Sequence, residues 1–218
     1  MVKKDSSIAY VFLAGDCPKI WSNDLPQKDD LIVAVDGGYK HAKGNGLQPD
    51  LLLGDFDSID TSDLAEAAEQ ETFLMQWPTA KDFSDAELAF AELSKRKVYQ
   101  YRIFGALGGD RVDHMLANLN LFLSLHQQNC KIEIFNGHVH AEFLSNETRV
   151  FDGSPGDQIS LVPYSPIVKS VSFTNVLYPL HSEELFWGKA RSISNEFIGN
   201  EACLTLGEGI LLAIHYRK

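Results

Sequence analysis

The chain has 218 residues, with 19 Lys or Arg against 30 Asp or Glu, and its formal net charge is −11. Non-specific nucleic-acid binding depends on basic contacts to phosphates, so this acidic chain is a poor candidate for it. Hydrophobic residues make up 44% and charged residues 22%, which is typical of a folded globular protein. Residues 1–113 hold 20 carboxylates and 12 Lys or Arg, a balance of −8. This local excess favours a cation site in the first half of the chain.

Neither a leader nor a membrane span is expected. The apolar run Ile8–Gly15 after Met1–Asp5 is too short for a signal sequence with a cleavage site. No run approaches the ~18 apolar residues of a transmembrane helix. The three cysteines, Cys17, Cys130 and Cys203, are odd in number and far apart, which indicates reduced thiols rather than disulfides. We therefore expect a cytoplasmic protein.

Short apolar runs alternate with helical stretches in the first half. A strand covered on both faces requires a nearly continuous apolar run, and such runs occur at Ile8–Ala14, Leu31–Val35, Leu51–Leu53, Thr72–Gln76 and Tyr99–Phe104. Helices are expected at Gly38–Lys43, Ser62–Gln70, Ser84–Lys95 and Asp113–Gln128. Ser84 and Glu87 have the spacing of a capping box, which marks the start of the third helix. The alternation predicts an α/β domain with a parallel sheet.

The second half has a different pattern, with short β runs and turns but no helix of ordinary length. Strands are expected at Arg149–Phe151, Gln158–Pro163, Ile167–Thr174, Ala202–Leu206 and Ile210–His215. This succession predicts a small all-β sandwich. The expected domains are residues 1–145 and 146–218, with the boundary in Ser145–Glu147. Trp187 is expected in the β core.

Four polar clusters follow predicted strands or open predicted helices in the first half. They are Val35–Gly38, Gly54–Ser58, Lys81–Asp85 and Gly105–His114. Any single Asp after a strand is more often a helix cap or a turn former. In open parallel sheets, however, ligands bind beyond the carboxyl ends of the strands. We therefore expect the four clusters to converge on one site.

These residue types suit a phosphorylated ligand with a divalent cation. Mg²⁺ commonly binds one or two carboxylates together with phosphate oxygens, and Asp55, Asp57 and Asp85 could supply the carboxylates. Paired glycines let backbone N–H groups approach phosphates closely. Arg111 and Lys81 could neutralise the remaining phosphate charge. The chain has no GxxxxGK[ST] motif, so a P-loop enzyme is not expected.

These motifs resemble those of the thiamine pyrophosphokinase (thiamine diphosphokinase) family, in the right order and over nearly the whole chain. The matching segments are Asp36-Gly37-Gly38, Gly54–Ser58, Lys81–Glu87, Gly105–Asn118, Tyr178-Pro179-Leu180 and Ser194–Phe197. Two positions depart from the family pattern. Ser84 stands where Thr is usual, and Asp110 separates the glycine pair from Arg111.

The resemblance implies an ATP-binding α/β domain and a thiamine-binding β-sandwich domain in a homodimer, with the active site at the subunit interface. It implies transfer of the terminal diphosphate of ATP to the thiamine hydroxyl, with release of AMP. The metal ligands would be Asp55, Asp57 and Asp85. The catalytic set would add Asp82, Arg111 and Asp113. The cofactor and nucleotide set would be Asp36, Gly37, Gly38, Lys81, Ser84, Gly108, Gly109 and His114, and Ser192, Ser194 and Asn195 would contact thiamine.

Three alternatives remain open at this point. The first is a diphosphokinase acting on another alcohol, such as a hydroxymethylpterin. The second is a phosphatase with Asp55 as nucleophile, which the position of the Asp55-x-Asp57 pair after the third strand disfavours. The third is a sensor that binds nucleotide or thiamine without turnover. Trp187 or Phe197 could also stack on thiamine. The acceptor of the alcohol proton is open among Asp82, Asp85 and Asp113.

Overall fold

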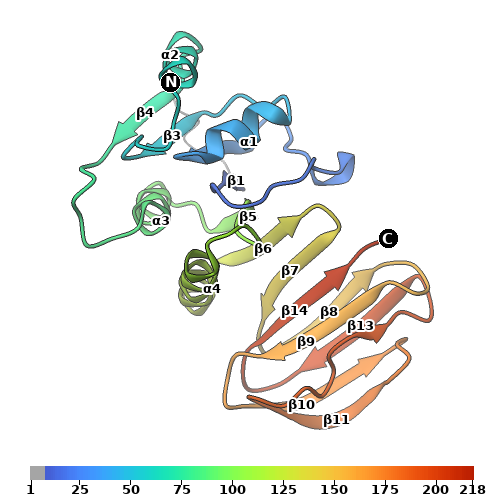
Figure 1. Cartoon of the computed structure of the whole chain (residues 1–218). Coiled ribbons are helices and arrows are strands. Elements are labelled where there is room, and N and C mark those ends of the chain that lie inside the picture. Colours follow the sequence, from blue (N-terminus) through green and yellow to red (C-terminus); the bar gives the residue numbers. More distant parts are fainter. Residues whose placement is uncertain (1–7) are drawn as a thin grey trace. The chain divides into compact units, whose positions relative to one another are not determined.

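The computed structural model describes residues 8–218, which divide between residues 137 and 138 into two compact units, an N-terminal and a C-terminal one (Figure 1). The segment Met1–Asp5, on which the leader prediction partly depends, lies outside the described residues. Within residues 8–218, no helix is long and apolar enough to span a membrane.

The N-terminal unit confirms the expected alternation of strands and helices. Its strands are β1 (Ala9–Phe12), β2 (Leu31–Val35), β3 (Leu51–Gly54), β4 (Phe73–Gln76), β5 (Gln100–Phe104) and β6 (Lys131–Asn136). Its helices are α1 (Gly38–Gly44), α2 (Thr61–Glu69), α3 (Asp85–Lys95), α4 (Val112–Gln127) and the short 3₁₀ helix η1 (Ser22–Asp24). The observed bounds of the expected elements differ from the predicted ones by at most two residues, and β6 and η1 are additional.

The strands of this unit run parallel in the spatial order β6-β5-β1-β2-β3-β4. The chain therefore starts in the middle at β1, builds outward through β4, and then crosses to the other side of β1 for β5. Such a reversal of strand order leaves a crevice at the carboxyl ends of the strands on either side of it. The loops after β1, β2 and β5 all begin at this point.

Alternating side chains from these strands pack against helices on both faces of the sheet. On one face, Phe12 and Phe104 stack with their ring centroids 5.1 Å apart, and Ala42 of α1 belongs to the same core cluster. On the other face, Phe90 of α3 makes edge contacts with Tyr101 and with Phe122 of α4. Burial on both faces explains why the strands are nearly continuous apolar runs.

The start of α3 is fixed by the predicted capping box. The Ser84 hydroxyl accepts a hydrogen bond from the Glu87 N–H, and the Glu87 carboxylate accepts one from the Ser84 N–H. Two backbone donors that the helix cannot use internally are therefore satisfied. The cap sets the first residue of the helix at Asp85, which is one of the expected site residues.

The C-terminal unit contains only strands and turns. Its strands are β7 (Val139–Leu144), β8 (Glu147–Asp152), β9 (Gln158–Pro163), β10 (Ile167–Thr174), β11 (Leu180–Phe186), β12 (Asn195–Glu196), β13 (Glu201–Leu206) and β14 (Leu211–Tyr216). The five expected strands are present, and β7, β11 and β12 are additional. The expected domain boundary lay at 145/146, whereas the compact units divide at 137/138. The difference arises because β7 pairs along its full length with β14.

The strands of the C-terminal unit pair antiparallel in the orders β12-β9-β14-β7 and β11-β10-β13-β8. One apolar core contains side chains from both groups, including Leu161 of β9, Phe173 of β10 and Leu204 of β13. Phe197 is 1% exposed and stacks on His215 with 4.8 Å between the ring centroids. The prediction that Trp187 fills this core is wrong, because Trp187 follows the end of β11 in a turn and is 69% exposed.

Candidate functional site

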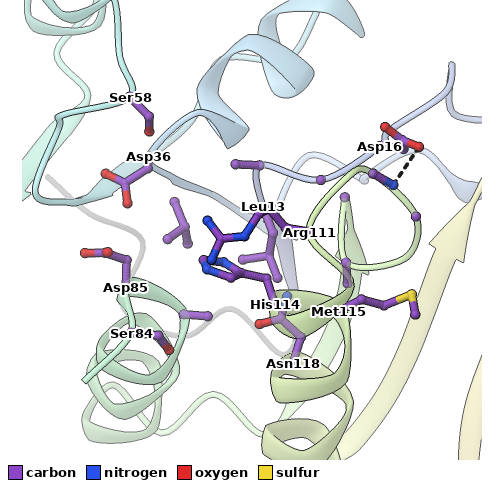
Figure 2. Close-up of a pocket in the computed structure, with 18 of the residues that line it drawn as sticks. Leu13, Asp16, Asp36, Ser58, Ser84, Asp85, Arg111, His114, Met115 and Asn118 are labelled. Atoms are coloured by element: carbon purple, nitrogen blue, oxygen red, sulfur yellow. Dashed lines mark hydrogen bonds between the residues drawn. The ribbon is translucent and has the colours of Figure 1, made fainter. Parts of the chain in front are cut away.

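A cavity of about 660 Å³ lies at the carboxyl edge of the parallel sheet, within the N-terminal unit. It is lined from the loops after β1, β2, β3 and β5 and from the first turns of α3 and α4 (Figure 2). The predicted convergence of the clusters is therefore observed. Nine expected site residues line the cavity: Asp36, Asp55, Asp57, Ser84, Asp85, Gly108, Gly109, Arg111 and His114.

Asp36 follows β2 directly and is held in an unusual backbone conformation. Its φ is 46°, and its carboxylate Oδ1 accepts a hydrogen bond of 3.1 Å from the Phe56 N–H. Space for this carboxylate depends on Gly54, because a Cβ at that position would lie 1.9 Å from Asp36 Oδ1. The glycine at the end of β3 thus lets the loop after β2 place a carboxylate between neighbouring strands.

The loop after β3 supplies the next two carboxylates. Asp55 Oδ1 accepts a hydrogen bond of 3.1 Å from the Asp57 N–H, and the intervening Phe56 has a φ of 68°. The side chain of Asp55 is 8% exposed. The pKa of Asp55 is lowered, first by this backbone N–H and then by Lys81. The pKa of Asp57 is raised, chiefly by the charge of Asp55.

Lys81 bridges two of the aspartates. Its Nζ lies 3.3 Å from Asp55 Oδ2 and 2.9 Å from Asp85 Oδ1, and the lysine side chain is only 12% exposed. Burial lowers the pKa of Lys81, but its contacts with Asp85 and Asp55 outweigh this effect and raise it overall. Asp85 Oδ1 is buried and accepts no hydrogen bond from any residue in 8–218, so this ion pair is its principal contact.

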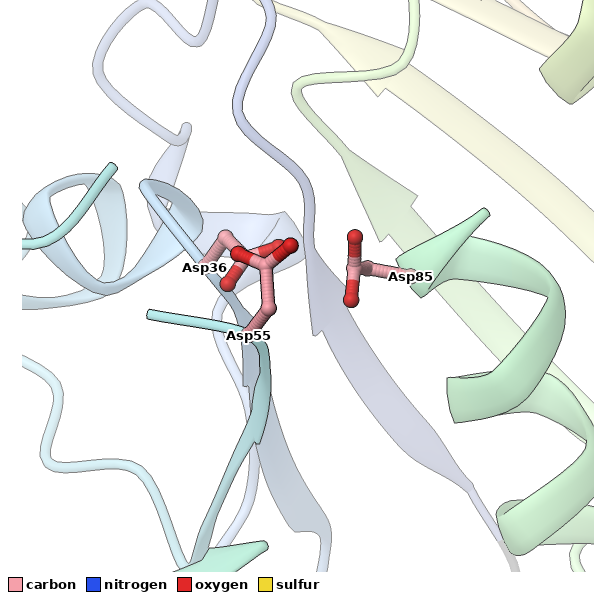
Figure 3. Close-up of side chains that lie close together, drawn as sticks. All are labelled: Asp36, Asp55 and Asp85. Atoms are coloured by element: carbon pink, nitrogen blue, oxygen red, sulfur yellow. The ribbon is translucent and has the colours of Figure 1, made fainter. Parts of the chain in front are cut away.

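Asp36, Asp55 and Asp85 form the tightest acidic group in the described chain. One carboxylate oxygen from each lies within 4.8 Å of those of the other two, and the three side chains point toward one another (Figure 3). The pKa of Asp36 is raised to about 7, chiefly by burial; the Phe56 N–H opposes this shift, and Asp85 and Asp55 add to it. Three such oxygens are the ligand type that Mg²⁺ prefers.

This group differs from the expected metal set in one member. Asp55 and Asp85 belong to both, but the third oxygen comes from Asp36 rather than Asp57. Asp57 lines the same cavity from the solvent side of its loop. The positive φ of Phe56 turns the Asp57 backbone N–H toward Asp55. The spacing of Asp55 and Asp57 in the sequence gave no sign of this turn.

The loop between β5 and α4 forms another wall of the cavity. Gly108 and Gly109 have φ values of 80° and 82°, which only glycine adopts readily. Arg111 follows and points into the cavity beside His114 (Figure 2). The Arg111 guanidinium makes two hydrogen bonds, of 2.9 and 2.7 Å, to the Asp113 carboxylate. These bonds hold the pKa of Asp113 well below its usual range.

Five expected site residues do not line the cavity: Gly37, Gly38, Lys81, Asp82 and Asp113. Lys81 and Asp113 act on it through partners that do. Gly38 has a packing role, because a Cβ there would lie 2.0 Å from the Phe12 carbonyl oxygen. Asp82 is exposed. The lining residues that lie outside the four expected clusters are Leu13, Ala14, Gly15, Asp16, Ala86, Met115 and Asn118.

The segment Ala14-Gly15-Asp16 could have been found from the sequence. It follows the first predicted strand with a glycine and an aspartate, as the other clusters follow theirs. In a sheet whose first strand lies in the middle, the loop after that strand borders the crevice. The sequence does not reveal that the first strand lies in the middle of the sheet.

The three residues expected to contact thiamine lie in the C-terminal unit, in and next to β12. Ser192 and Ser194 have φ values of 72° and 54°, and the Ser194 N–H donates to the Ser160 hydroxyl at 2.9 Å. The Ser192 Oγ is buried and makes no hydrogen bond within residues 8–218. Asn195 differs: it is 1% exposed, accepts from the Tyr178 and Glu196 N–H groups, and donates to the Tyr178 carbonyl.

Comparisons with known proteins agree on one family. Residues 22–134 match the family model described as "Thiamin pyrophosphokinase, catalytic domain", and residues 146–211 match "Thiamin pyrophosphokinase, vitamin B1 binding domain". The chain is 29% identical over 185 residues to a thiamine pyrophosphokinase of Bacillus subtilis, covering 84% of this chain and 86% of that protein.

Solved structures extend this similarity to the fold. A crystal structure of the Bacillus subtilis thiamine pyrophosphokinase has a TM-score of 0.82 at 27% identity, covering 97% of this chain and 99% of that one. A structure from Geobacillus thermodenitrificans has a TM-score of 0.78 at 28% identity, covering 97% of both chains. A Candida albicans structure, at 14% identity, has a TM-score of 0.81 over 99% of this chain and 90% of that chain, and this likeness concerns the fold alone.

Proposed function

Because the chain belongs to the thiamin pyrophosphokinase family, it is an enzyme that forms thiamine diphosphate from thiamine, and we propose that Mg²⁺-bound ATP donates the diphosphate. AMP is then the second product. This proposal rests chiefly on the group of three carboxylates near the carboxyl ends of the parallel strands, beside a cavity of about 660 Å³. A volume of this size suits a nucleotide.

The donor set fits a divalent cation. Asp55 and Asp85 are the proposed ligands, Asp36 completes the close group, and Asp57, which lines the same cavity, remains a proposed ligand from the sequence. A cation would relieve the repulsion among these carboxylates and give the buried Asp85 Oδ1 a ligand contact beside its ion pair with Lys81. When bound, Mg²⁺ would neutralise phosphate oxygens and orient the triphosphate.

The residues of this chain then position the two reactants. The glycine loop with Gly108 and Gly109 is proposed to lie against the phosphates, with Arg111 supplying positive charge and Asp113 orienting its guanidinium. Ser84 and His114 border the same space. The thiamine hydroxyl attacks the β-phosphorus in line, the bond to the α-phosphate oxygen breaks, and AMP leaves with that oxygen. Positioning and electrostatic stabilisation supply most of the rate enhancement.

The proton acceptor is proposed among Asp85, Asp82 and Asp113, of which Asp113 is a weaker base because its bonds to Arg111 lower its pKa. Asp85 lines the cavity, whereas Asp82 is exposed in the loop before α3. Asp85 would therefore be the better-placed base. Since it is also a proposed metal ligand, the proton could pass to it through a bound water.

Thiamine recognition is assigned to the C-terminal unit. We place the thiamine pyrimidine near Ser192 and Ser194, because the buried Ser192 Oγ needs a hydrogen-bond partner and both residues hold a backbone conformation that non-glycine residues rarely adopt. Asn195 would fix the backbone next to Ser194 rather than contact thiamine, since its side chain already makes hydrogen bonds to the backbone of Tyr178 and Glu196. The catalytic, ATP-binding domain is residues 1–145 and the thiamine-binding domain 146–218.

A homodimer with the active site at the subunit interface is part of the proposal. The C-terminal unit exposes large apolar side chains that a partner subunit could cover: Leu177, Tyr178, Phe186, Trp187, Ile193 and Ile198. The three free cysteines support a reducing, cytoplasmic location. Size-exclusion chromatography with light scattering tests the dimer, and a monomer at micromolar concentration would contradict it.

One assay tests the reaction itself. The protein is incubated with ATP, Mg²⁺ and thiamine, and the products are separated. AMP and thiamine diphosphate in equal amounts are expected. ADP in place of AMP would reject diphosphoryl transfer, and turnover of a hydroxymethylpterin but not of thiamine would reject the substrate. An aspartyl-phosphate intermediate would favour the phosphatase alternative, and binding without turnover the sensor.

A further inference from the structure

Asp16 lies in the loop after β1, at the reversal of strand order, and none of the roles above involves it. Its carboxylate Oδ2 accepts a hydrogen bond of 2.8 Å from the backbone N–H of Gly109, across the cavity wall (Figure 2). The residues are 93 positions apart in the chain. Asp16 also lies before residue 22, where the match to the catalytic-domain family model begins.

The loop between β5 and α4, which Asp16 contacts, contains no helix or strand of its own. Gly108 and Gly109 are consecutive residues with positive φ, and such a pair loses much conformational entropy when it is ordered. Its bond to Asp16 is charge-assisted, which makes it stronger than a bond between neutral groups. The Gly109 N–H is also committed to Asp16 and is not available to a phosphate.

Two further contacts hold the same loop, one from the loop after β1 and one from the end of β6. The Gly15 N–H donates to the Gly105 carbonyl at 2.9 Å, and the Asn136 amide donates to the Leu107 carbonyl at 3.0 Å. The backbones touch, because a Cβ on Gly15 would lie 2.6 Å from the Gly105 oxygen. These contacts hold the start of the loop, and Asp16 holds its far end, next to Asp110 and Arg111.

We propose that Asp16 is a positioning residue for the nucleotide: it fixes the Gly108–Gly109 backbone so that Arg111 is presented to the phosphates before they bind. The proposal deepens the proposed function and rests on it. Without Asp16, the loop must be ordered when the nucleotide binds, and the cost of ordering appears as weaker binding. The reacting groups themselves are unchanged.

The proposal predicts a split between binding and turnover. Asp16→Ala should raise the KM for Mg²⁺-ATP by about tenfold, the factor that about 1.4 kcal/mol of ordering cost would give, with kcat within about twofold of the wild-type value. Asp16→Asn keeps an oxygen acceptor of the same shape and should restore most of the loss. Asp152→Ala, an exposed aspartate of the C-terminal unit, is the charge-matched control and should leave both constants unchanged.

Hydrogen exchange of the Gly109 amide gives a readout that does not depend on activity. The amide should exchange faster in Asp16→Ala than in the wild type or Asp152→Ala, in the absence of any nucleotide. If the protein did not use ATP, this exchange would still report the loop contact, so failure of the proposed function can be told from failure of this inference.

Three results would overturn the proposal. Unchanged exchange at Gly109 would remove the structural role. Faster exchange with an unchanged KM for Mg²⁺-ATP would remove the link to the nucleotide. An Asp16→Asn variant as impaired as Asp16→Ala would show that the charge itself is needed, as for direct contact with a cation. Circular dichroism melts of each variant confirm that it is folded when it is assayed.

Discussion

The two units of the chain use their polar groups in opposite ways. In the N-terminal unit, Asp36, Asp55 and Asp85 face one another with their oxygens within 4.8 Å, and Lys81 bridges two of them. In the C-terminal unit, the side-chain amide of Asn195 makes three hydrogen bonds to the backbone of Tyr178 and Glu196. In the N-terminal unit, the close carboxylates repel one another, and a cation can relieve that repulsion. In the C-terminal unit, the polar side chain fixes the conformation of the backbone around it. Substitutions should therefore separate activity from stability in the first region and couple them in the second.

The largest expected effect is on turnover in the N-terminal cavity. Asp55→Asn and Asp85→Asn should each lower kcat by about a thousandfold, because loss of a cation ligand removes several kcal/mol of transition-state stabilisation. Each variant should stay folded with only a modest fall in melting temperature, because Lys81 keeps one of its two carboxylate partners. Steady-state kinetics and thermal melts measure both quantities.

Asp57→Asn is the informative comparison for this pair. Its carboxylate lines the cavity but lies outside the group of three, so the expected loss is about tenfold rather than a thousandfold. A loss equal to that of Asp85→Asn would support Asp57 as a metal ligand, as the sequence predicts. Near-normal turnover of Asp55→Asn would contradict its role as a ligand.

In the C-terminal unit, Asn195→Ala should affect stability and thiamine use together. It removes the buried Asn195 amide and leaves the Tyr178 and Glu196 backbone groups without these part-buried hydrogen bonds, at a cost of about 1–3 kcal/mol in the free energy of unfolding. The KM for thiamine should rise in the same variant, because Ser194 is its neighbour on the chain. Denaturant unfolding and steady-state kinetics are the measurements.

Ser194→Ala separates the two effects. The Ser194 contact to Ser160 uses the backbone N–H, so removal of the hydroxyl should raise the KM for thiamine without lowering stability. The comparison would break if Asn195→Ala were as stable as the wild type. It would also break if Ser194→Ala lost as much stability as Asn195→Ala.

How far the sequence predicts this fold depends on whether the signal is local. The strands β2, β9 and β10 have their expected bounds because each is a run of apolar or alternating residues between turn formers. The two-residue strand β12 was not expected, because it is defined by pairing to β9 rather than by its own composition. Trp187 was misplaced for the same reason: burial depends on where the turn after β11 lies.

The candidate site shows the same limit. The aspartates at strand ends were predictable, since parallel strands bring their carboxyl ends together. The close approach of Asp36 to Asp55 and Asp85 depends on the space that Gly54 leaves, and the position of Asp57 depends on the positive φ of Phe56. The position of Asp16 beside the cavity depends on the spatial strand order, which places β1 between β2 and β5. These are properties of tertiary contact, and no short motif records them.

Lys81 tests whether the acidic group is held together by its own counter-ion. In EDTA, Lys81→Met should lower the free energy of unfolding by about 2 kcal/mol, because Asp55 and Asp85 lose a largely buried partner. Added Mg²⁺ should then raise its melting temperature more than that of the wild type, since no ammonium competes with the cation. Lys40→Met is the matched control, because the Lys40–Asp60 pair is 52% and 68% exposed. Equal responses of the two variants would contradict this role.

The last expected effect is a pH dependence of the free energy of unfolding that comes from Asp36. Its pKa in the folded protein is raised to about 7, against about 4 in an unfolded chain, so the folded state binds the extra proton between these values. Its stabilising contribution is therefore complete below pH 4 and is lost as the pH rises through 7. Asp36→Asn, which keeps an acceptor for the Phe56 N–H, should not lose it. In EDTA, the wild type should lose about 2–3 kcal/mol relative to this variant between pH 5 and 8. Parallel unfolding curves across that range would mean that Asp36 is ionised throughout, and the repulsion inferred for the N-terminal unit would then be weaker than its geometry suggests.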